Sequence, residues 1–196
     1  MDLATTQAVL SRLYTDTDFR KLFSLDPQAA LKTIGLEGED ALQIATVKPQ
    51  QLRFFARSLI RKRLGEVKKL LPLTRHALGE VFDPLFRSYA ANNRLESGKA
   101  HQKDAVRFCR FVHEQARAEL SRVPWGMDAL RFEAAHLEST IRGRYFSAKF
   151  FHYPVQAGAG TITVAGPLRK RATLAIWLRF HSNGPLRFFA IGNPFR

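Results

Sequence analysis

Residues 172–181, with the sequence ATLAIWLRFH, decide the fold class that we predict for this 196-residue chain. Successive side chains of a β-strand point to opposite faces, so a strand here would have two different faces. One face would carry Ala172, Leu174, Ile176, Leu178 and Phe180, and the other Thr173, Ala175, Trp177, Arg179 and His181. Asn183-Gly184 follows and favours a tight turn into residues 186–191. Together these features predict an antiparallel hairpin.

Strand-like sequence is confined to the C-terminal part of the chain. Residues 145–155 and 161–164 are two further strand candidates, whereas the periodic segments before Gly143 follow a helical spacing. Helices that are segregated from strands along a sequence favour the α+β class over alternating α/β. We therefore expect an N-terminal multi-helix body followed by a small C-terminal antiparallel β-sheet.

The longest predicted helix runs from Pro49 to about Leu71, and Pro72 ends it. Apolar residues recur along this helix at steps of three and four and form one stripe: Leu52, Phe55, Ala56, Leu59, Ile60, Leu64, Val67 and Leu71. Residues 101–122 and 125–141 are predicted to form two further helices, separated by Pro124.

Composition divides the chain into three predicted domains. Residues 1–48 form a short acidic helical extension, residues 49–141 the helical body, and residues 142–196 a basic β-rich module. The last of these contains nine lysines and arginines and no aspartate or glutamate, within a chain of net charge +14. A surface of one sign attracts partners of the other sign, so we expect this module to bind an anionic partner or an extended peptide.

Two groups of residues are the candidate binding sites. The predicted peptide- or anion-binding group in the basic module consists of Arg169, Lys170, Arg171, Trp177, Arg179 and Arg187. The predicted partner-docking group on the long helix consists of Arg53, Arg57, Arg61 and Lys68. The second group fits an acidic protein or a nucleic acid, although such residues also occur on a helix face that is merely solvated. The aromatics of the basic module fit a single-strand nucleic-acid platform, or simple packing of the sheet on helices.

The chain lacks the residue patterns of the common catalytic and metal sites. The six histidines form no metal-ligand motif such as His-Glu-x-x-His, although His136 follows Glu133 by three residues. Neither a Gly-x-Gly-x-x-Gly motif nor a P-loop is present. Cys109 lies on an apolar helix stripe and is expected to be a buried structural thiol. We expect no metal, no cofactor and no enzymatic activity.

Other sequence features suggest the compartment. The N-terminus lacks a basic segment followed by an apolar one, and no apolar run approaches the ~20 residues needed to span a bilayer. A single cysteine excludes an internal disulfide. We therefore expect a cytoplasmic protein with no membrane span.

Several short motifs resemble a known family in their order along the chain. They are residues 53–72 (RFFARSLIRKRLGEVKKLLP), residues 74–79 (TRHALG), residues 85–90 (LFRSYA), residues 104–108 (DAVRF), Pro124-Trp125, residues 130–133 (LRFE) and residues 171–179 (RATLAIWLR). This order resembles the helical partner proteins encoded beside multinuclear non-heme iron oxidases, of which the methanobactin-biosynthesis partner subunit is the best-known type. The resemblance implies a protein without catalytic residues that packs on the oxidase and helps hold a precursor peptide.

The function predicted from these observations is that of a non-catalytic adaptor. It would bind an iron-oxidase-type partner enzyme and help present a precursor peptide for modification. The alternative is a regulatory nucleic-acid-binding module that uses the basic helix and the basic β-module, since some members of the resembling family carry a DNA-binding label.

Overall fold

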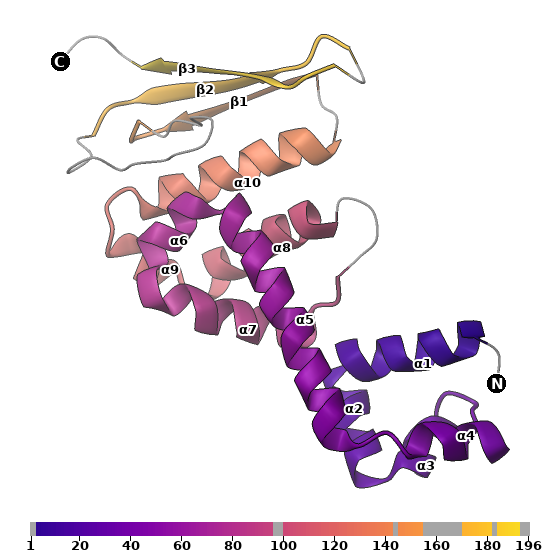
Figure 1. The fold of residues 1–196 in the computed structure, drawn as a ribbon. Helices are drawn as coiled ribbons and strands as arrows, with labels where there is room; N and C mark the ends of the chain where they lie inside the picture. The colour runs from indigo at the N-terminus through magenta and orange to yellow at the C-terminus, as the bar shows by residue number, and fades with distance from the viewer. Residues whose placement is uncertain (1–2, 96–99, 143–144, 155–169, 182–183, 193–196) are drawn as a thin grey trace. The chain divides into compact units, whose positions relative to one another are not determined.

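The α+β class is confirmed by a computed structural model, which describes residues 3–95, 100–142, 145–154, 170–181 and 184–192 (Figure 1). The described residues up to 142 are mostly helical, and a three-stranded antiparallel sheet follows. By its contacts the chain forms two compact units, residues 1–65 with 87–94, and residues 66–86 with 95–196. The predicted domains, 1–48, 49–141 and 142–196, follow composition rather than contacts and stay a prediction. None of the described helices is long and apolar enough to cross a membrane.

The first unit is helical. It contains α1 (Leu3–Thr15), α2 (Thr17–Leu25), α3 (Pro27–Lys32), α4 (Gly38–Ala45) and the first part of α5 (Pro49–Leu70). Its core consists of Val9, Leu13, Phe19, Phe23, Ala30, Leu31, Leu36, Ala41, Ile44 and Leu52. The predicted long helix is confirmed, because α5 begins at Pro49, a residue tolerated at the first helical position, and ends at Leu70.

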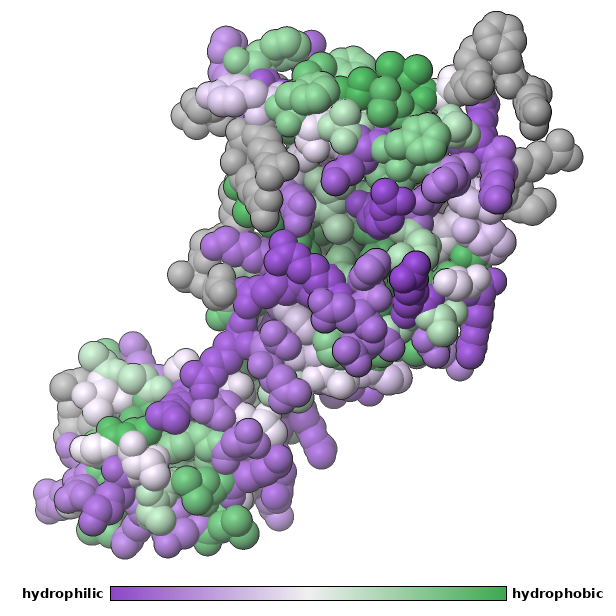
Figure 2. All heavy atoms as spheres, turned by 180° about the vertical axis from the view of Figure 1, so that it is seen from behind, coloured by the Kyte–Doolittle hydropathy of each residue, from purple (hydrophilic) through white to green (hydrophobic). Residues whose placement is uncertain are grey.

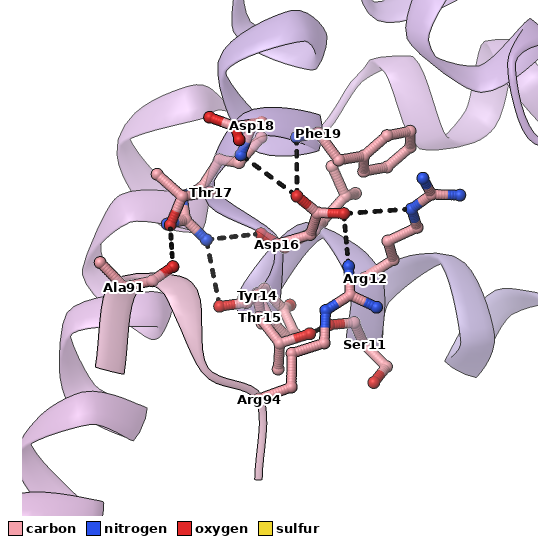
Figure 3. A network of polar contacts seen from close by, with 12 residues as sticks. Ser11, Arg12, Tyr14, Thr15, Asp16, Thr17, Asp18, Phe19, Ala91 and Arg94 are labelled. Atoms are coloured by element: carbon pink, nitrogen blue, oxygen red, sulfur yellow. Dashed lines mark hydrogen bonds and ion pairs between the residues drawn. The ribbon is translucent and has the colours of Figure 1, made fainter. Parts of the chain in front are cut away.

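One carboxylate organises the polar contacts of this unit (Figure 3). Asp16 precedes α2, and its Oδ1 accepts from the backbone N–H groups of Asp18 at 3.1 Å and Phe19 at 3.0 Å. Its Oδ2 pairs with the guanidinium groups of Arg12 and Arg94. The hydrogen bond from Phe19, together with both arginines, lowers the pKa of Asp16 despite its partial burial. Asp16 therefore caps α2 and joins it to Arg94, which belongs to the same unit.

The second unit holds the remaining helices: α6 (Pro72–Leu78), the 3-10 turn η1 (Gly79–Val81), the start of α7 (Phe82–Asn92), α8 (Ala100–Gln115), α9 (Arg117–Ser121) and α10 (Gly126–Arg142). Phe108 packs edge-on against Phe82 and Phe86, with ring centroids 5.2 and 5.1 Å apart. The single helix predicted over residues 101–122 is wrong, because Ala116 leaves the helical conformation at φ −134° and ψ 30° and separates α8 from α9.

The sheet consists of β1 (Phe146–Phe151), β2 (Thr173–Leu178) and β3 (Arg187–Gly192), in the order β1-β2-β3. Both pairs are antiparallel, with Ala175 opposite Lys149 on one side and Ala190 on the other. The predicted hairpin pairing of β2 with β3 is confirmed. Asn183 of its turn and the strand candidate 161–164 lie outside the described residues.

Helix α10 holds the sheet in place from one side (Figure 1). The ring of Phe132 on α10 contacts the rings of Phe151, Trp177 and Phe188 at centroid distances of 5.7, 5.7 and 5.6 Å. Near the start of α10, Asp128 Oδ2 accepts from the backbone N–H groups of His152 at 2.6 Å and Tyr153 at 3.1 Å. An aromatic cluster and one buried carboxylate therefore fix one face of the sheet on this helix.

Candidate interaction surfaces

The two faces of the sheet differ in burial. On β2, Thr173, Ala175 and Trp177 are buried against the helical side, whereas Leu174 is exposed. The alternation predicted for residues 172–181 is therefore confirmed over β2. The face that packs on α10 is the one that contains Trp177.

The outer sheet face, which points away from α10, is almost entirely apolar. The register places nine residues on it in three rows: Phe146, Leu178 and Arg187; Ala148, Ile176 and Phe189; Phe150, Leu174 and Ile191. Phe146, Phe150 and Ile191 keep 62%, 53% and 58% of their surface exposed. In Figure 2 apolar side chains gather at the top of the view, where Figure 1 places the sheet. Exposed apolar patches of this kind mark binding surfaces in soluble proteins.

Trp177 is not a surface anchor, because the structure buries it completely. Its indole Nε1–H donates to His136 Nδ1 on α10 at 3.0 Å, and its ring contacts Phe132. Packing on the helices, the second role open to this residue, is the one observed. Burial lowers the pKa of His136, which favours the neutral ring that can accept this hydrogen bond. His136 thus binds the sheet through Trp177, and this contact is structural.

The predicted cations of the basic module are distributed around the sheet. Arg187 is exposed on the outer sheet face, with its guanidinium 5.5 Å from the centre of the Phe180 ring. Lys170 and Arg171 are exposed just before β2, and Arg179 is half-buried just after it. Arg169 lies outside the described residues. The structure therefore places one of the predicted cations, Arg187, directly on the outer sheet face.

A second exposed surface lies on the part of α5 that belongs to the first unit. Arg53, Arg57 and Arg61 are exposed, as expected for a docking face. Phe54 is exposed beside these arginines at 71%, and Phe55 and Leu59 are exposed further round the helix at 50% and 41%. Phe55 and Leu59 belong to the apolar stripe predicted from the sequence, so part of that stripe faces solvent. We call these six residues the α5 surface.

Lys68 does not belong to the α5 surface. Its ammonium lies 2.7 Å from Asp83 Oδ1, and Asp83 stands in the first turn of α7. Both side chains are about two-thirds buried, so the lysine charge is already matched within the second unit. The role in partner docking expected for Lys68 is therefore not supported by its position.

Glu133 is a buried acid that sequence reasoning did not single out as structural. Its two carboxyl oxygens accept from the backbone N–H groups of Leu73 at 2.7 Å and Thr74 at 2.9 Å, at the start of α6. Burial raises the pKa of Glu133 to about 7, and these hydrogen bonds only partly offset that effect. The group caps a helix, and its contacts point to no ligand.

Other titratable groups also have structural partners. Cys109 is buried, as expected, and burial raises the pKa of its thiol, which disfavours the reactive thiolate. It lines a shallow cavity of about 190 Å³ together with Arg110, His113, Glu114, Leu130, Arg131 and Ala134. Arg110 pairs with Glu138 and Arg131 pairs with Asp128. Within the described ranges, no three or more His, Cys, Asp or Glu side chains are grouped to hold a metal ion.

The comparisons with known proteins identify one related segment. A family model described as SCO6045-like, C-terminal domain, matches residues 45–114. The match covers α5 to α8 almost completely, including the whole α5 surface, and ends before α9, α10 and the sheet. No curated protein matches the chain. The family description does not name partner proteins of iron oxidases, so that resemblance stays a prediction.

Proposed function

We propose that this protein is a non-catalytic adaptor that docks on a partner enzyme and helps hold a peptide for modification. The observation that supports docking is the α5 surface, where the exposed Phe54 lies beside three exposed arginines on one side of the helix. The exposed Phe55 and Leu59 extend the apolar area further round the same helix. Aromatic and arginine side chains are enriched at the centres of protein interfaces and dominate their energies. Residues 41–65 contain no acid, so this surface suits an acidic partner.

The enzyme partner proposed is an iron oxidase of the multinuclear non-heme type. This choice rests on the resemblance of residues 53–72 and the downstream motifs to partner proteins of such oxidases. The basic β-module would then contribute to peptide binding, with Lys170, Arg171 and Arg187 as exposed cations near the sheet. Electrostatic complementarity of this kind increases association rates and selects acidic peptides.

The test begins with the genes beside this one, which should encode an iron-oxidase-type enzyme and a short precursor peptide if the proposal holds. The full chain is then titrated with that enzyme in the presence of that peptide. We expect a stable complex, and Phe54→Ser or Arg57→Glu should weaken it by about tenfold or more because interface hot spots are of these types. Arg117→Glu is the matched control, because Arg117 is exposed at the start of α9, where an acid is tolerated by the helix.

The control and the variants together decide the outcome. Equal binding by wild type, Phe54→Ser and Arg57→Glu would remove the α5 surface from the model. Absence of a complex when enzyme, peptide and chain are all present would overturn the adaptor function itself. Peptide modification by the enzyme at the same rate with and without the chain would do the same.

A further inference from the structure

The outer sheet face is an apolar surface without a covering layer among the described residues. Eight of its nine residues are apolar, and Arg187 is the exception. Six of the apolar ones, Phe146, Ala148, Phe150, Leu174, Phe189 and Ile191, are more than a third exposed. An antiparallel sheet usually has an apolar face on the core and a polar face in water, whereas both faces of this sheet are apolar. Covering the second apolar face with a partner is therefore favoured.

Charge restricts what this partner can be. From Ser139 to Arg196 the chain contains no aspartate or glutamate. Arg187 is exposed on the outer sheet face, and Lys170 and Arg171 are exposed just before β2. A second copy stacked on the same face would bring these cations together, and like charges in close contact cost binding energy. A partner whose apolar side chains are flanked by carboxylates would match both the apolar face and its basic margin.

The identity of the central residues favours a polypeptide over a nucleic acid. The central strand contributes Leu174, Ile176 and Leu178 to the outer sheet face, and none of these has an aromatic ring. The phenylalanines of the face lie on the two edge strands, β1 and β3, on either side of this aliphatic row. Nucleic-acid platforms bind bases by stacking them on aromatic side chains, and aliphatic side chains cannot stack in this way. Side chains of a protein helix, by contrast, interdigitate with aliphatic residues.

The size of the face fits a single helix. Three strands of six residues each give a surface ~10 Å across and ~20 Å long, from the usual strand spacing and rise. An α-helix is ~10 Å wide and covers ~20 Å in ~13 residues. On the inner face, α10 already packs on the sheet in this way.

We propose that the outer sheet face binds an acidic amphipathic helix of a partner polypeptide, so that the bound sheet lies between two helices. The apolar stripe of that helix would cover Phe150, Ile176 and Phe189. Its glutamates and aspartates would reach Arg187, the cation that the register places on this face. The inference rests on the proposed function only for the class of partner, a polypeptide, and it does not depend on the α5 surface.

The probe is a fluorescent synthetic peptide of about 14 residues, with leucines at helical spacing and glutamates on its other faces. Its anisotropy is measured with the full chain at about 0.15 M salt, where weak long-range attraction is screened. We expect binding, with a gain of helical circular dichroism. The double variant Phe150→Ser/Ile191→Ser should bind at least about tenfold more weakly. Phe55→Ser, at a residue of similar exposure on α5, should bind as the wild type does.

A second measurement locates the peptide with a single substitution on the face. Because Cys109 is buried, a single introduced cysteine can carry an environment-sensitive dye. Ile191→Cys places the dye on the outer sheet face, and Ala190→Cys places it one residue earlier, at an exposed position on the opposite side of β3. We expect the emission of the dye to shift to shorter wavelength on peptide addition at residue 191 only.

Several outcomes would overturn the proposal. One is that Phe55→Ser weakens peptide binding while Phe150→Ser/Ile191→Ser does not. The others are an equal dye shift at residues 190 and 191, and a wild type that does not bind the peptide. Equal affinity for a peptide with lysines in place of the glutamates would remove the acidic requirement. Tighter binding of a single-stranded oligonucleotide, or of phosphatidylserine vesicles, would assign the face to another class of partner. A complex with the oxidase that forms normally in Phe150→Ser/Ile191→Ser would leave the adaptor function standing on its own.

Discussion

Glu133 places a carboxyl group that is 5% exposed against the two backbone amides at the start of α6. Burial raises its pKa from 4.5 to about 7, so the folded protein holds this proton more tightly than the unfolded chain does. Between these two pH values the folded state binds more protons, and the free energy of unfolding therefore falls as pH rises. Across this pH range the free energy of unfolding falls by roughly 3 kcal/mol at most.

We predict that Glu133→Gln removes this part of the pH dependence. Urea denaturation at pH 5 and pH 7.5 should show the wild type more stable at the lower pH, relative to the variant, since glutamine does not titrate. His136 acts in the opposite direction, because its lowered pKa makes the folded state less stable as pH falls below 6.5. The comparison with Glu133→Gln separates the two effects, and an unchanged difference between the two pH values in the variant would contradict the role of Glu133.

At the scale of elements, Asp128 on α10 governs the attachment of the sheet. Its carboxylate accepts from the backbone amides of His152 and Tyr153, just after β1, and its side chain is only 6% exposed. Removing an acceptor from buried donors leaves them without a partner, which costs more than the hydrogen bond itself contributes.

We predict that Asp128→Ala destabilises the protein by about 2 kcal/mol and increases hydrogen exchange at the amides of residues 152 and 153. Glu138→Ala is the control on the same helix, since Glu138 pairs with Arg110 at 3.1 Å and its side chain is about a third exposed. Loss of that pair should cost less than about 1 kcal/mol. Exchange at residues 152 and 153 that rises equally in both variants would show that α10 as a whole, and not this carboxylate, holds β1.

At the scale of the whole molecule, a net charge of +14 attracts any polyanion, so weak binding of nucleic acid at low salt is expected. The adaptor function and the nucleic-acid alternative differ in what remains at higher salt. For duplex DNA, log affinity falls by ~0.9 per neutralised phosphate for each unit of log salt.

We predict that the affinity of the full chain for DNA and RNA falls steeply as salt rises. At about 0.15 M salt the dissociation constants should all be micromolar or weaker. The measurement is a salt series of anisotropy titrations with duplex and single-stranded probes. The triple variant Arg53→Gln/Arg57→Gln/Arg61→Gln should reduce the slope without abolishing low-salt binding, because the cations near the sheet remain. Sub-micromolar binding at physiological salt, lost on changing Lys170 and Arg171 to Ala, would favour the alternative.

The sequence by itself determined the elements that local patterns specify. Alternation over residues 172–181 predicted β2, Asn183-Gly184 predicted its pairing with β3, and Pro49 and Pro72 bounded α5 to within two residues. These features depend on neighbours along the chain, such as strand pleat, turn geometry and the missing amide of proline. The same reasoning predicted that Cys109 is buried and that Arg53, Arg57 and Arg61 are exposed to solvent.

Only the tertiary structure decided which side of each element is buried. Alternation gives β2 two faces without showing which one meets α10, and the structure buries Trp177, which needs a partner for its indole N–H and finds His136, 41 residues earlier in the chain. The more apolar set, including Leu174 and Ile176, is left as the outer sheet face. In the same way, the ion pair with Asp83 places Lys68 away from the other residues of the predicted docking group. Phe54, which was not part of that group, is exposed beside its arginines. Contacts between residues far apart in the chain decide these outcomes, because burial of a side chain depends on which element packs against it.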